Sequence, residues 1–249
     1  MQWFPSLFAG ILLTMLCSCA SKTTVTDSLK ARAAPVSPFI QHPRELKPQR
    51  ERAPFALVWI NPELPVKRVQ YNSIYIAPVE TRYLRAPRPN LSRATTVENV
   101  ERPVREITSL MQQAFTRAFV ESPSPRLHVT PHPVAGGVTL QLALVELNAT
   151  DIVGNAVKTA VPYGGVLSPL TSGNIAIEGR VCDSATGEVL FEFADNERDQ
   201  MTLVSLRDFS PFNHAKAAVG AWATQFEELT RTSASHKVKD SPLFTLDPL

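Results

Sequence analysis

The stretch Ile175-Ala-Ile-Glu-Gly-Arg-Val-Cys-Asp-Ser-Ala-Thr-Gly-Glu-Val-Leu-Phe-Glu-Phe193 has the pattern of a β-hairpin. On both sides of a central turn, apolar residues alternate with charged ones such as Glu178 and Glu192. This period of two places the apolar side chains on one face of each strand. In the turn, the carboxylate of Asp183 can accept hydrogen bonds from backbone amides, and Gly187 can take the positive φ that a short loop requires. The hairpin therefore predicts a β-sheet as the framework.

Four further segments have strand patterns. Residues 137–148 alternate along their whole length and predict a long strand with one covered face. The other three, 55–60, 73–79 and 126–130, are shorter. Pro78 places the second of these at a sheet edge or near its own end, because proline has no N–H to donate. Together with the hairpin, these segments predict about six strands.

Two segments change to a helical period. Between Pro103 and Glu121, apolar residues recur three and four positions apart, and Pro103 suits the first turn, where its missing N–H costs nothing. A second helix is expected from about Phe212 to Thr230. Its apolar stripe comprises Ala215, Ala218, Val219, Trp222, Phe226 and Leu229. We therefore predict an α+β fold with two layers, in which a mostly antiparallel sheet of about six strands carries two amphipathic helices on one face.

The amino-terminal end has the pattern of a bacterial lipoprotein leader. Its apolar run from Leu7 to Leu16 is shorter than the roughly 20 residues that a membrane-spanning helix needs. A branched apolar residue, Leu16, and a small residue, Ser18, precede Cys19 as they do in a lipobox. We expect residues 1–18 to be removed and Cys19 to be acylated, an attachment that more than one acyl chain makes effectively permanent. The alternative is an ordinary secretory signal in which Cys19 is incidental.

This leader sets the expected domain organisation. We predict a cleaved lipoprotein signal peptide (1–18), a lipidated, proline-rich, basic tether (19–53), a single α+β domain (54–232) and a flexible tail (233–249). The tether prediction rests on its prolines and its excess of Lys and Arg over Asp and Glu. Ala20, rather than Asp, follows the cysteine. The resemblance to Gram-negative lipoproteins then implies an outer-membrane anchor facing the periplasm, with the inner membrane as the alternative.

The charge and the cysteine content indicate which binding partners and which disulfide bonds to expect. The formal net charge is +2, and the basic residues of the tether come without interleaved aromatic side chains, so nucleic acid is not an expected partner. The membrane is an expected partner through acylated Cys19, and the basic tether is either a solvated linker or a contact to anionic headgroups or envelope polymers. With Cys19 acylated, Cys182 has no cysteine to pair with and is expected to be a small half-buried apolar residue.

No pattern in the chain indicates catalysis, a metal or a cofactor. His128 and His132 flank Pro131, which breaks the helical geometry that would bring both imidazoles onto one ion. The acidic residues after the hairpin lack a glycine-turned ligand loop and are expected to be a solvated strand end. These are Asp195, Glu197 and Asp199. We therefore expect no catalytic residue, no metal site and no cofactor, and a protein that is not an enzyme.

An apolar, glycine-bearing loop lies between two predicted strands, from Val153 to Leu170. Loops of this length are usually either functional or disordered. One interpretation is an exposed patch that contacts a partner or the membrane surface. The other is a loop that folds back over an open sheet face and completes the core. The residues of the candidate interaction loop are Val157, Val161, Tyr163, Val166, Leu167 and Leu170.

Several short motifs remain distinctive. They are Leu57-Val-Trp-Ile-Asn-Pro62, Ile74-Tyr-Ile-Ala-Pro-Val79, Asp183-x-x-Thr-Gly-Glu188, Phe212-x-x-Ala-Lys216 and Trp222-Ala223. In this order and spacing the chain resembles the bacterial lipoprotein family known as domain of unknown function 3313. The likeness takes in Pro38-Phe-Ile40 and Leu46-Lys-Pro48, which implies more structure in the expected tether than its composition suggests. Residues 152–171 depart from the family pattern in being shorter and less continuously apolar.

The resemblance implies an exported lipoprotein and offers no catalytic residue. Our leading hypothesis is therefore a non-catalytic accessory or scaffold domain that binds a protein or an envelope polymer in the periplasm. The second is a domain that binds or senses a small apolar, lipid-like ligand in a pocket between sheet and helices. The third is a hydrolase whose catalytic groups are too scattered in the sequence to form a motif.

Overall fold

The protein was analysed as a computed structural model, which describes residues 35–49, 52–86, 98–148, 174–198, 213–233 and 235–239. The elements in chain order are β1 (Leu57–Ile60), α2 (Leu64–Lys67), the 3-10 helix η1 (Arg68–Gln70), β2 (Ser73–Ile76), α3 (Glu98–Val120), β3 (His128–Val129), β4 (Gly137–Asn148), β5 (Asn174–Asp183), β6 (Val189–Arg198) and α5 (Asn213–Arg231). Every predicted strand and both predicted helices are present. The short turns α2 and η1 have no predicted counterpart, since so few residues show no helical period.

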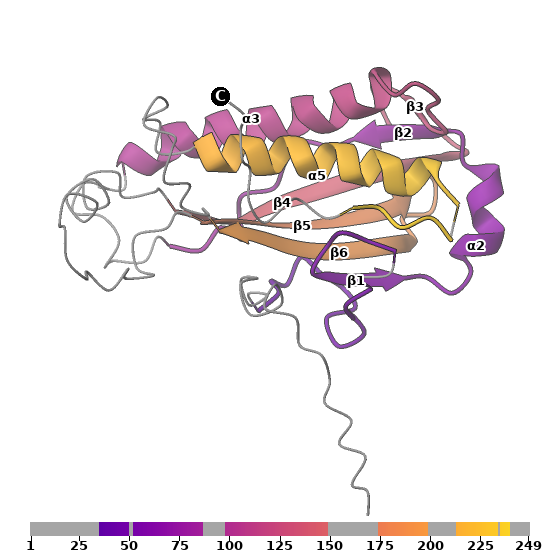
Figure 1. Ribbon diagram of the computed structural model, residues 1–249, viewed down its shortest axis with the longest axis horizontal. Helices are drawn as coiled ribbons and strands as arrows, with labels where there is room; N and C mark the ends of the chain where they lie inside the picture. Colours follow the sequence, from indigo (N-terminus) through magenta and orange to yellow (C-terminus); the bar gives the residue numbers. More distant parts are fainter. Residues whose placement is uncertain are drawn as a thin grey trace, which may run out of the picture. The chain divides into compact units, whose positions relative to one another are not determined.

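The six strands form one sheet in the order β1-β6-β5-β4-β2-β3 (Figure 1). The pairs β1–β6, β5–β6 and β4–β5 are antiparallel, as predicted for most of the sheet. The pairs β2–β4 and β2–β3 are parallel, so the sheet is mixed. Parallel neighbours need a long crossover connection, and the chain between β2 and β3 contains α3. The fold class is α+β.

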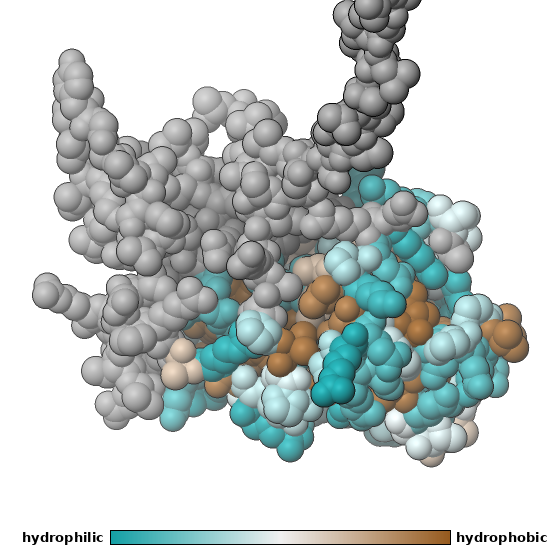
Figure 2. Space-filling view, turned by 90° about the horizontal axis from the view of Figure 1, so that it is seen from below, coloured by the Kyte–Doolittle hydropathy of each residue, from teal (hydrophilic) through white to brown (hydrophobic). Residues whose placement is uncertain are grey.

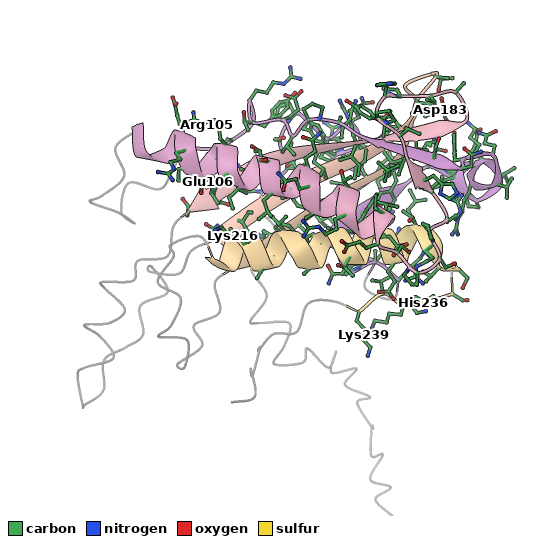
Figure 3. The ribbon with its side chains drawn as sticks, turned by 90° about the horizontal axis from the view of Figure 1, so that it is seen from above. Arg105, Glu106, Asp183, Lys216, His236 and Lys239 are labelled. Atoms are coloured by element: carbon green, nitrogen blue, oxygen red, sulfur yellow. The ribbon has the colours of Figure 1, made fainter. Side chains whose placement is uncertain are left out.

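The β5–β6 hairpin has the turn chemistry that its sequence predicts. The carboxylate oxygen Oδ1 of Asp183 accepts hydrogen bonds from the N–H groups of Ala185 and Thr186, each at 2.8 Å. Gly187 has a φ of 74°, a conformation that costs glycine little because it has no Cβ. This turn closes the end of the sheet that lies away from Arg105 and Glu106 of α3 (Figure 3).

The main core lies between the sheet and helices α3 and α5, which contact each other along their length (Figure 1). Leu140, Leu142 and Leu144 of β4 all face this core and are fully buried. The predicted stripe of α5 is buried in this core, while the α3 stripe is buried at Ile107, Met111 and Phe119 and partly buried elsewhere. One prediction about α3 is wrong: the helix begins at Glu98, so Pro103 lies inside it rather than in its first turn. The helix accommodates this at the loss of one backbone hydrogen bond near its amino-terminal end.

The opposite face of the sheet is also covered, contrary to the expectation of one covered side. Residues 35–49, which we call the strap, place Phe39, Ile40 and Leu46 against Ala143 and Val145 of β4 in a second apolar cluster. This part of the expected tether is therefore folded onto the sheet, and the domain boundary expected at residue 54 is too late. Because the strap adds material on this face, a strictly two-layer arrangement stays a prediction.

Two buried glutamates hold the strap. The Glu192 carboxylate accepts hydrogen bonds from the backbone N–H of Gln41 at 2.7 Å, and from the backbone N–H and Nδ1 of His42, both at 2.9 Å. Glu178 accepts from the backbone N–H of Ser37 at 2.6 Å and from its hydroxyl at 2.5 Å. Burial raises the pKa of the Glu178 carboxyl above its ordinary value, although the bonds from Ser37 act in the opposite direction. The strap thus supplies the polar partners that buried carboxylates require.

Part of the expected flexible tail is packed as well. Val238 is 1% exposed and belongs to the main core. Its N–H donates to the backbone carbonyl of Arg52 at 3.1 Å, and Gln225 of α5 donates to the carbonyl of Lys239 at 3.1 Å. The segment after α5 therefore returns along that helix and meets the chain that follows the strap.

The helices of the described segments are amphipathic rather than uniformly apolar. None of them is both long and apolar enough to cross a bilayer. Where the view from below draws residues in colour, apolar side chains lie along the middle and polar ones surround them (Figure 2).

Candidate functional site

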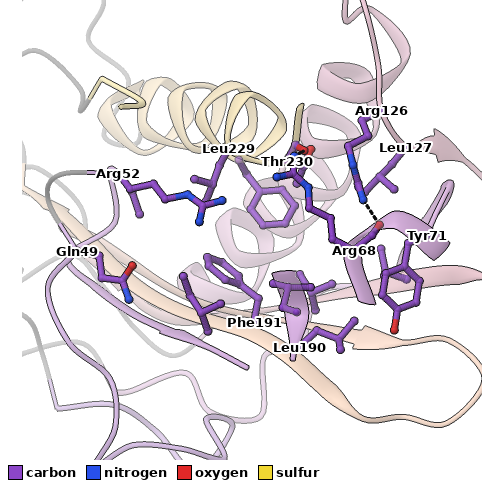
Figure 4. A pocket seen from close by; sticks show the side chains of 16 residues that line it. Gln49, Arg52, Arg68, Tyr71, Arg126, Leu127, Leu190, Phe191, Leu229 and Thr230 are labelled. Carbon is purple, nitrogen blue, oxygen red and sulfur yellow. Dashed lines mark hydrogen bonds between the residues drawn. The ribbon is translucent and has the colours of Figure 1, made fainter. Parts of the chain in front are cut away.

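A cavity of about 100 Å³ lies between the sheet and the carboxy-terminal half of α5 (Figure 4). Its interior is lined by apolar side chains from four strands and from α5. These include Ile60, Val138, Val181, Leu190, Phe226 and Leu229. The residues come together because the β5–β6 hairpin and β4 present their core face to α5, while the α2–η1 turns close one side.

One wall of the cavity consists of closely packed aromatic rings. Phe226 is 1% exposed and packs among other rings of the core, with its centroid 5.6 Å from that of Phe193 and 5.8 Å from that of Phe115. Tyr71 closes the side near the hairpin, where its hydroxyl donates to the carboxylate of Asp183 at 2.9 Å. Burial raises the pKa of the Tyr71 hydroxyl, and the hydrogen bond to Asp183 also contributes. The aromatic core and the Tyr71–Asp183 hydrogen bond thus form two sides of the cavity.

Three arginines surround the cavity. Arg52 and Arg126 extend toward Arg68 from different sides (Figure 4). Arg68 donates through one terminal nitrogen to the backbone carbonyls of Thr230 and Thr232, both at 2.8 Å, and its own carbonyl accepts from Arg126. Burial lowers the pKa of Arg52 and of Arg126, and the positive charge of Arg68 lowers each further. Arg68 therefore repels the guanidinium groups of both Arg52 and Arg126.

Of the three arginines, Arg52 has a buried side-chain donor, Nε, that lacks a hydrogen-bond acceptor among the described residues. The described residues that line the cavity include no Asp or Glu. Acids in the surrounding elements are engaged elsewhere: Glu188 contacts Lys67 at 2.6 Å, and Asp183 holds the hairpin turn and Tyr71. The cavity therefore combines an apolar interior with a positive rim that lacks a protein counter-charge within the described part of the chain.

Among the described residues that line the cavity, the hydroxyl groups are those of Tyr71 and Thr230. No Ser, Cys or His is among the described residues that line it. Across the described ranges, no cluster of three or more His, Cys, Asp or Glu side chains could hold a metal ion. Cys182 is 6% exposed, and burial raises the pKa of its thiol. The apolar interior can hold an apolar group, and the arginines beside it can bind a negatively charged one.

Several residues considered from sequence lie elsewhere. His128 is an exposed residue of β3, and His132 is exposed in the following turn. Asp195 is not part of a solvated strand end: its carboxylate accepts from Nε1 of buried Trp222 at 2.7 Å and from the N–H of Ala56 at 3.1 Å. The signal peptide (1–18), Cys19 and the candidate interaction loop lie outside the described residues, so all of these stay predictions. The loop residues concerned are Val157, Val161, Tyr163, Val166, Leu167 and Leu170.

The arginines of the cavity were not recognisable from sequence. Arg52 counts among the basic residues of the expected tether, and Arg68 and Arg126 belong to short segments without a strong pattern. No motif joins the three, because they converge only when the segment before β1, α2–η1 and the segment before β3 meet around α5. The one available signal was the resemblance of residues 38–48 to a folded part of the family.

The mixed sheet, its two helices and the strap define an α+β domain with a sheet–helix cavity. The chain belongs to the family described as protein of unknown function (DUF3313), whose model matches residues 35–226. The match begins where the strap begins, in agreement with its packing on the sheet.

Solved structures of low identity resemble the chain over about two thirds of its length. The PelC dodecamer from Paraburkholderia phytofirmans is 7% identical, with 64% of this chain and 89% of that chain covered and a TM-score of 0.36. Protein XCC0632 from Xanthomonas campestris is 13% identical, with coverage of 64% and 83% and a TM-score of 0.39. Lipoprotein GNA1162 from Neisseria meningitidis is 12% identical, with coverage of 62% and 97% and a TM-score of 0.27. No curated protein matches significantly.

Proposed function

We propose that this protein is a non-catalytic envelope lipoprotein, acylated at Cys19 and facing the periplasm from the outer membrane, whose domain binds the apolar part of a small ligand. The observation that carries the binding role is the apolar cavity between the sheet and α5. Ligand sites are typically concave, mainly apolar and largely formed before the ligand arrives, with a few polar groups that orient it. The cavity combines these properties with three arginines at its rim.

The size of the cavity limits the ligand. An apolar cavity of about 150 Å³ holds one benzene molecule. A volume of about 100 Å³ therefore accommodates about four carbon atoms, not the chains of a whole diacyl lipid. The ligand is accordingly a small molecule, or a larger one that inserts only one end.

The non-catalytic role is supported by the chemistry of the lining. Tyr71 and Thr230 supply the hydroxyl groups among the described lining residues, and both are engaged in structural hydrogen bonds. The Tyr71 hydroxyl donates to Asp183, whose carboxylate also holds the hairpin turn, and the Thr230 hydroxyl donates to the backbone carbonyl of Glu227. The pKa of Tyr71 is raised, which is the opposite of what an activated nucleophile needs.

Filling the cavity is expected to abolish binding of a small neutral probe. Ala53 lines the cavity and is 3% exposed, so Ala53→Leu adds three carbon atoms to the space that the probe would occupy. We expect the unmodified full-length lipoprotein in phosphatidylcholine nanodiscs to bind 1-pentanol, and Ala53→Leu to lose this binding. Ligand-observed NMR titration measures both, with protein-free nanodiscs as the blank.

The matched control is Ala217→Leu, which adds the same side chain at an exposed position of α5. This variant should bind 1-pentanol like the unmodified protein. Equal binding by both leucine variants would show that the cavity is not the site, and a melting curve of each variant checks that the fold is retained.

An accessory role through a protein partner is a second candidate, favoured by two exposed valines. Val66 of α2 and Val69 of η1 are 79% and 89% exposed, and they lie three residues apart on consecutive helical turns. Apolar atoms protrude at the right-hand edge of Figure 2, the side on which α2 lies in Figure 1. Exposed apolar side chains that lie together can mark a protein contact.

Crosslinking in intact cells tests this second candidate. A photo-crosslinking residue at position 69 is expected to capture one dominant envelope protein, and Val66→Asp in the same chain should reduce the capture. The same residue at position 120, where Val120 of α3 is 67% exposed, is the control and should capture nothing specific. Equal capture from both positions would contradict a contact at α2. The mass of the mature amino terminus, measured on the same material, tests acylation of Cys19.

A further inference from the structure

We propose that the ligand of the cavity is a small amphipathic anion: a carboxylate or phosphate group, held by the guanidinium groups of Arg52, Arg68 and Arg126, joined to a short apolar group inside. This inference rests on the proposed binding function and names the class of ligand. It follows from the charge of the rim, which the apolar interior alone does not explain.

The first argument is the uncompensated charge. Three guanidinium groups meet at one cavity whose described lining contains no carboxylate. Like charges at close range destabilise a folded protein unless a counter-charge is present, and burial strengthens their repulsion. Burial and the charge of Arg68 both disfavour the protonated forms of Arg52 and Arg126. An anion bound between them would remove this repulsion.

The second argument is the unused donors. Arginine presents five N–H groups and accepts no hydrogen bond. Within the described residues, the buried Nε of Arg52 has no acceptor, Arg68 uses one terminal nitrogen for two carbonyls, and Arg126 uses one for the carbonyl of Arg68. A buried donor without an acceptor is costly, and the oxygens of a carboxylate or phosphate match the planar fork of a guanidinium. The remaining donors therefore suit an oxyanion.

The third argument is the position of the apolar space. The arginines and the apolar residues Leu190, Phe226 and Leu229 line one continuous cavity (Figure 4). A free inorganic anion would leave the apolar part empty, and a hydrocarbon would leave the donors unpaired. A molecule with an anionic group and an apolar tail would pair the donors and also fill the apolar space. A tail of about four carbon atoms fits the volume.

The test compares four probes on the full-length lipoprotein in phosphatidylcholine nanodiscs by ligand-observed NMR titration. The probes are pentanoate, butyl phosphate, 1-pentanol and inorganic phosphate. We expect pentanoate or butyl phosphate to bind at least tenfold more tightly than 1-pentanol and than inorganic phosphate. An alkyl phosphate stands for a lipid headgroup and pentanoate for a free acid, so their ratio distinguishes the two sources.

Arg52→Met is the decisive variant, because it keeps the aliphatic stem and because no described residue accepts a hydrogen bond from Nε of Arg52. One charge-assisted hydrogen bond corresponds to about tenfold or more in affinity. We expect the affinity for the anionic probe to fall by that factor, and to fall by more than the affinity for 1-pentanol does. Arg105→Met, at an exposed arginine of α3, is the control and should change neither (Figure 3).

The outcomes separate this inference from the proposed function. If 1-pentanol binds as tightly as pentanoate and butyl phosphate, and Arg52→Met has no effect, the anionic ligand is ruled out while the apolar site stands. If inorganic phosphate binds as tightly as butyl phosphate, the site is for a free anion and the amphipathic ligand is wrong. If none of the four probes binds to the unmodified protein, both the inference and the proposed function fail.

Discussion

Phe226→Ala is expected to destabilise the domain by about 3–5 kcal/mol, the range for removing a buried aromatic side chain. Phe226 is 1% exposed and contacts five other rings, which come from α3, β6 and the segment before β1. These are Phe55, Phe115, Phe119, Phe191 and Phe193. Truncation leaves a cavity that the neighbouring rings cannot fill without leaving their own packing.

Urea denaturation of the full-length chain, followed by circular dichroism, measures this effect. Domains are typically stable by about 5–15 kcal/mol, so the loss should move the unfolding midpoint strongly. Lys216→Ala, at an exposed position of the same helix, is the control and should change stability by less than about 0.5 kcal/mol (Figure 3). A loss below about 1 kcal/mol for Phe226→Ala would contradict the central position of this ring, because even modest cavities cost more.

Glu192→Ala is expected to cost about 3 kcal/mol and to release the strap from the sheet. The carboxylate is fully buried and accepts from two backbone N–H groups and from the imidazole of His42. Hydrogen bonds to a charged group contribute about 1.5–3 kcal/mol each, and burial of the charge offsets part of their sum. The released donors would have to separate from the sheet to reach water.

Two measurements follow this second variant. Urea denaturation gives the loss of stability, and limited trypsin digestion tests the strap, in which the bond after Arg44 should be cut faster. Glu106→Ala removes an exposed glutamate that pairs with Arg102 on α3, and it should cost at most about 0.5 kcal/mol. If Glu192→Ala resists trypsin like the unmodified protein, the carboxylate does not hold the strap.

The strap runs from one face of the sheet to the cavity on the other face. It begins under Glu178 and Glu192 on one face, and its last residue, Gln49, lines the cavity on the other side. Arg52 follows three residues later and is tied through its carbonyl to Val238. The position of the Arg52 guanidinium therefore depends on both the segment before β1 and the segment after α5.

The elements that the sequence predicts well are those whose signals are local. Strand β4 has the predicted bounds, because an alternation of twelve residues leaves no ambiguity of period. The β5–β6 turn forms as predicted, because the contacts of Asp183 and the φ of Gly187 lie within a few residues. The parallel pairing of β2 with β3 and β4 could not be predicted, because no local sequence pattern specifies which distant strands pair or in which direction.

The burial of Glu178 and Glu192 shows where local reasoning fails. Both alternate with apolar residues, so the pattern places them on the solvent side of the hairpin. They are 1% and 0% exposed because the strap, far away in sequence, covers that face and supplies N–H donors. An alternating pattern predicts that the two faces of a strand differ in polarity. It does not predict whether another segment covers the polar face.

By itself, the sequence determined the α+β class, the hairpin, the two amphipathic helices and the family, because each depends on periodicity, turn chemistry or motif order along the chain. Only the tertiary structure decided that the strap folds onto the sheet and that Arg52, Arg68 and Arg126 surround one apolar cavity. The physical reason is that a cavity and its charge arise where segments distant in sequence meet, and the packing that brings them together is a property of the whole core.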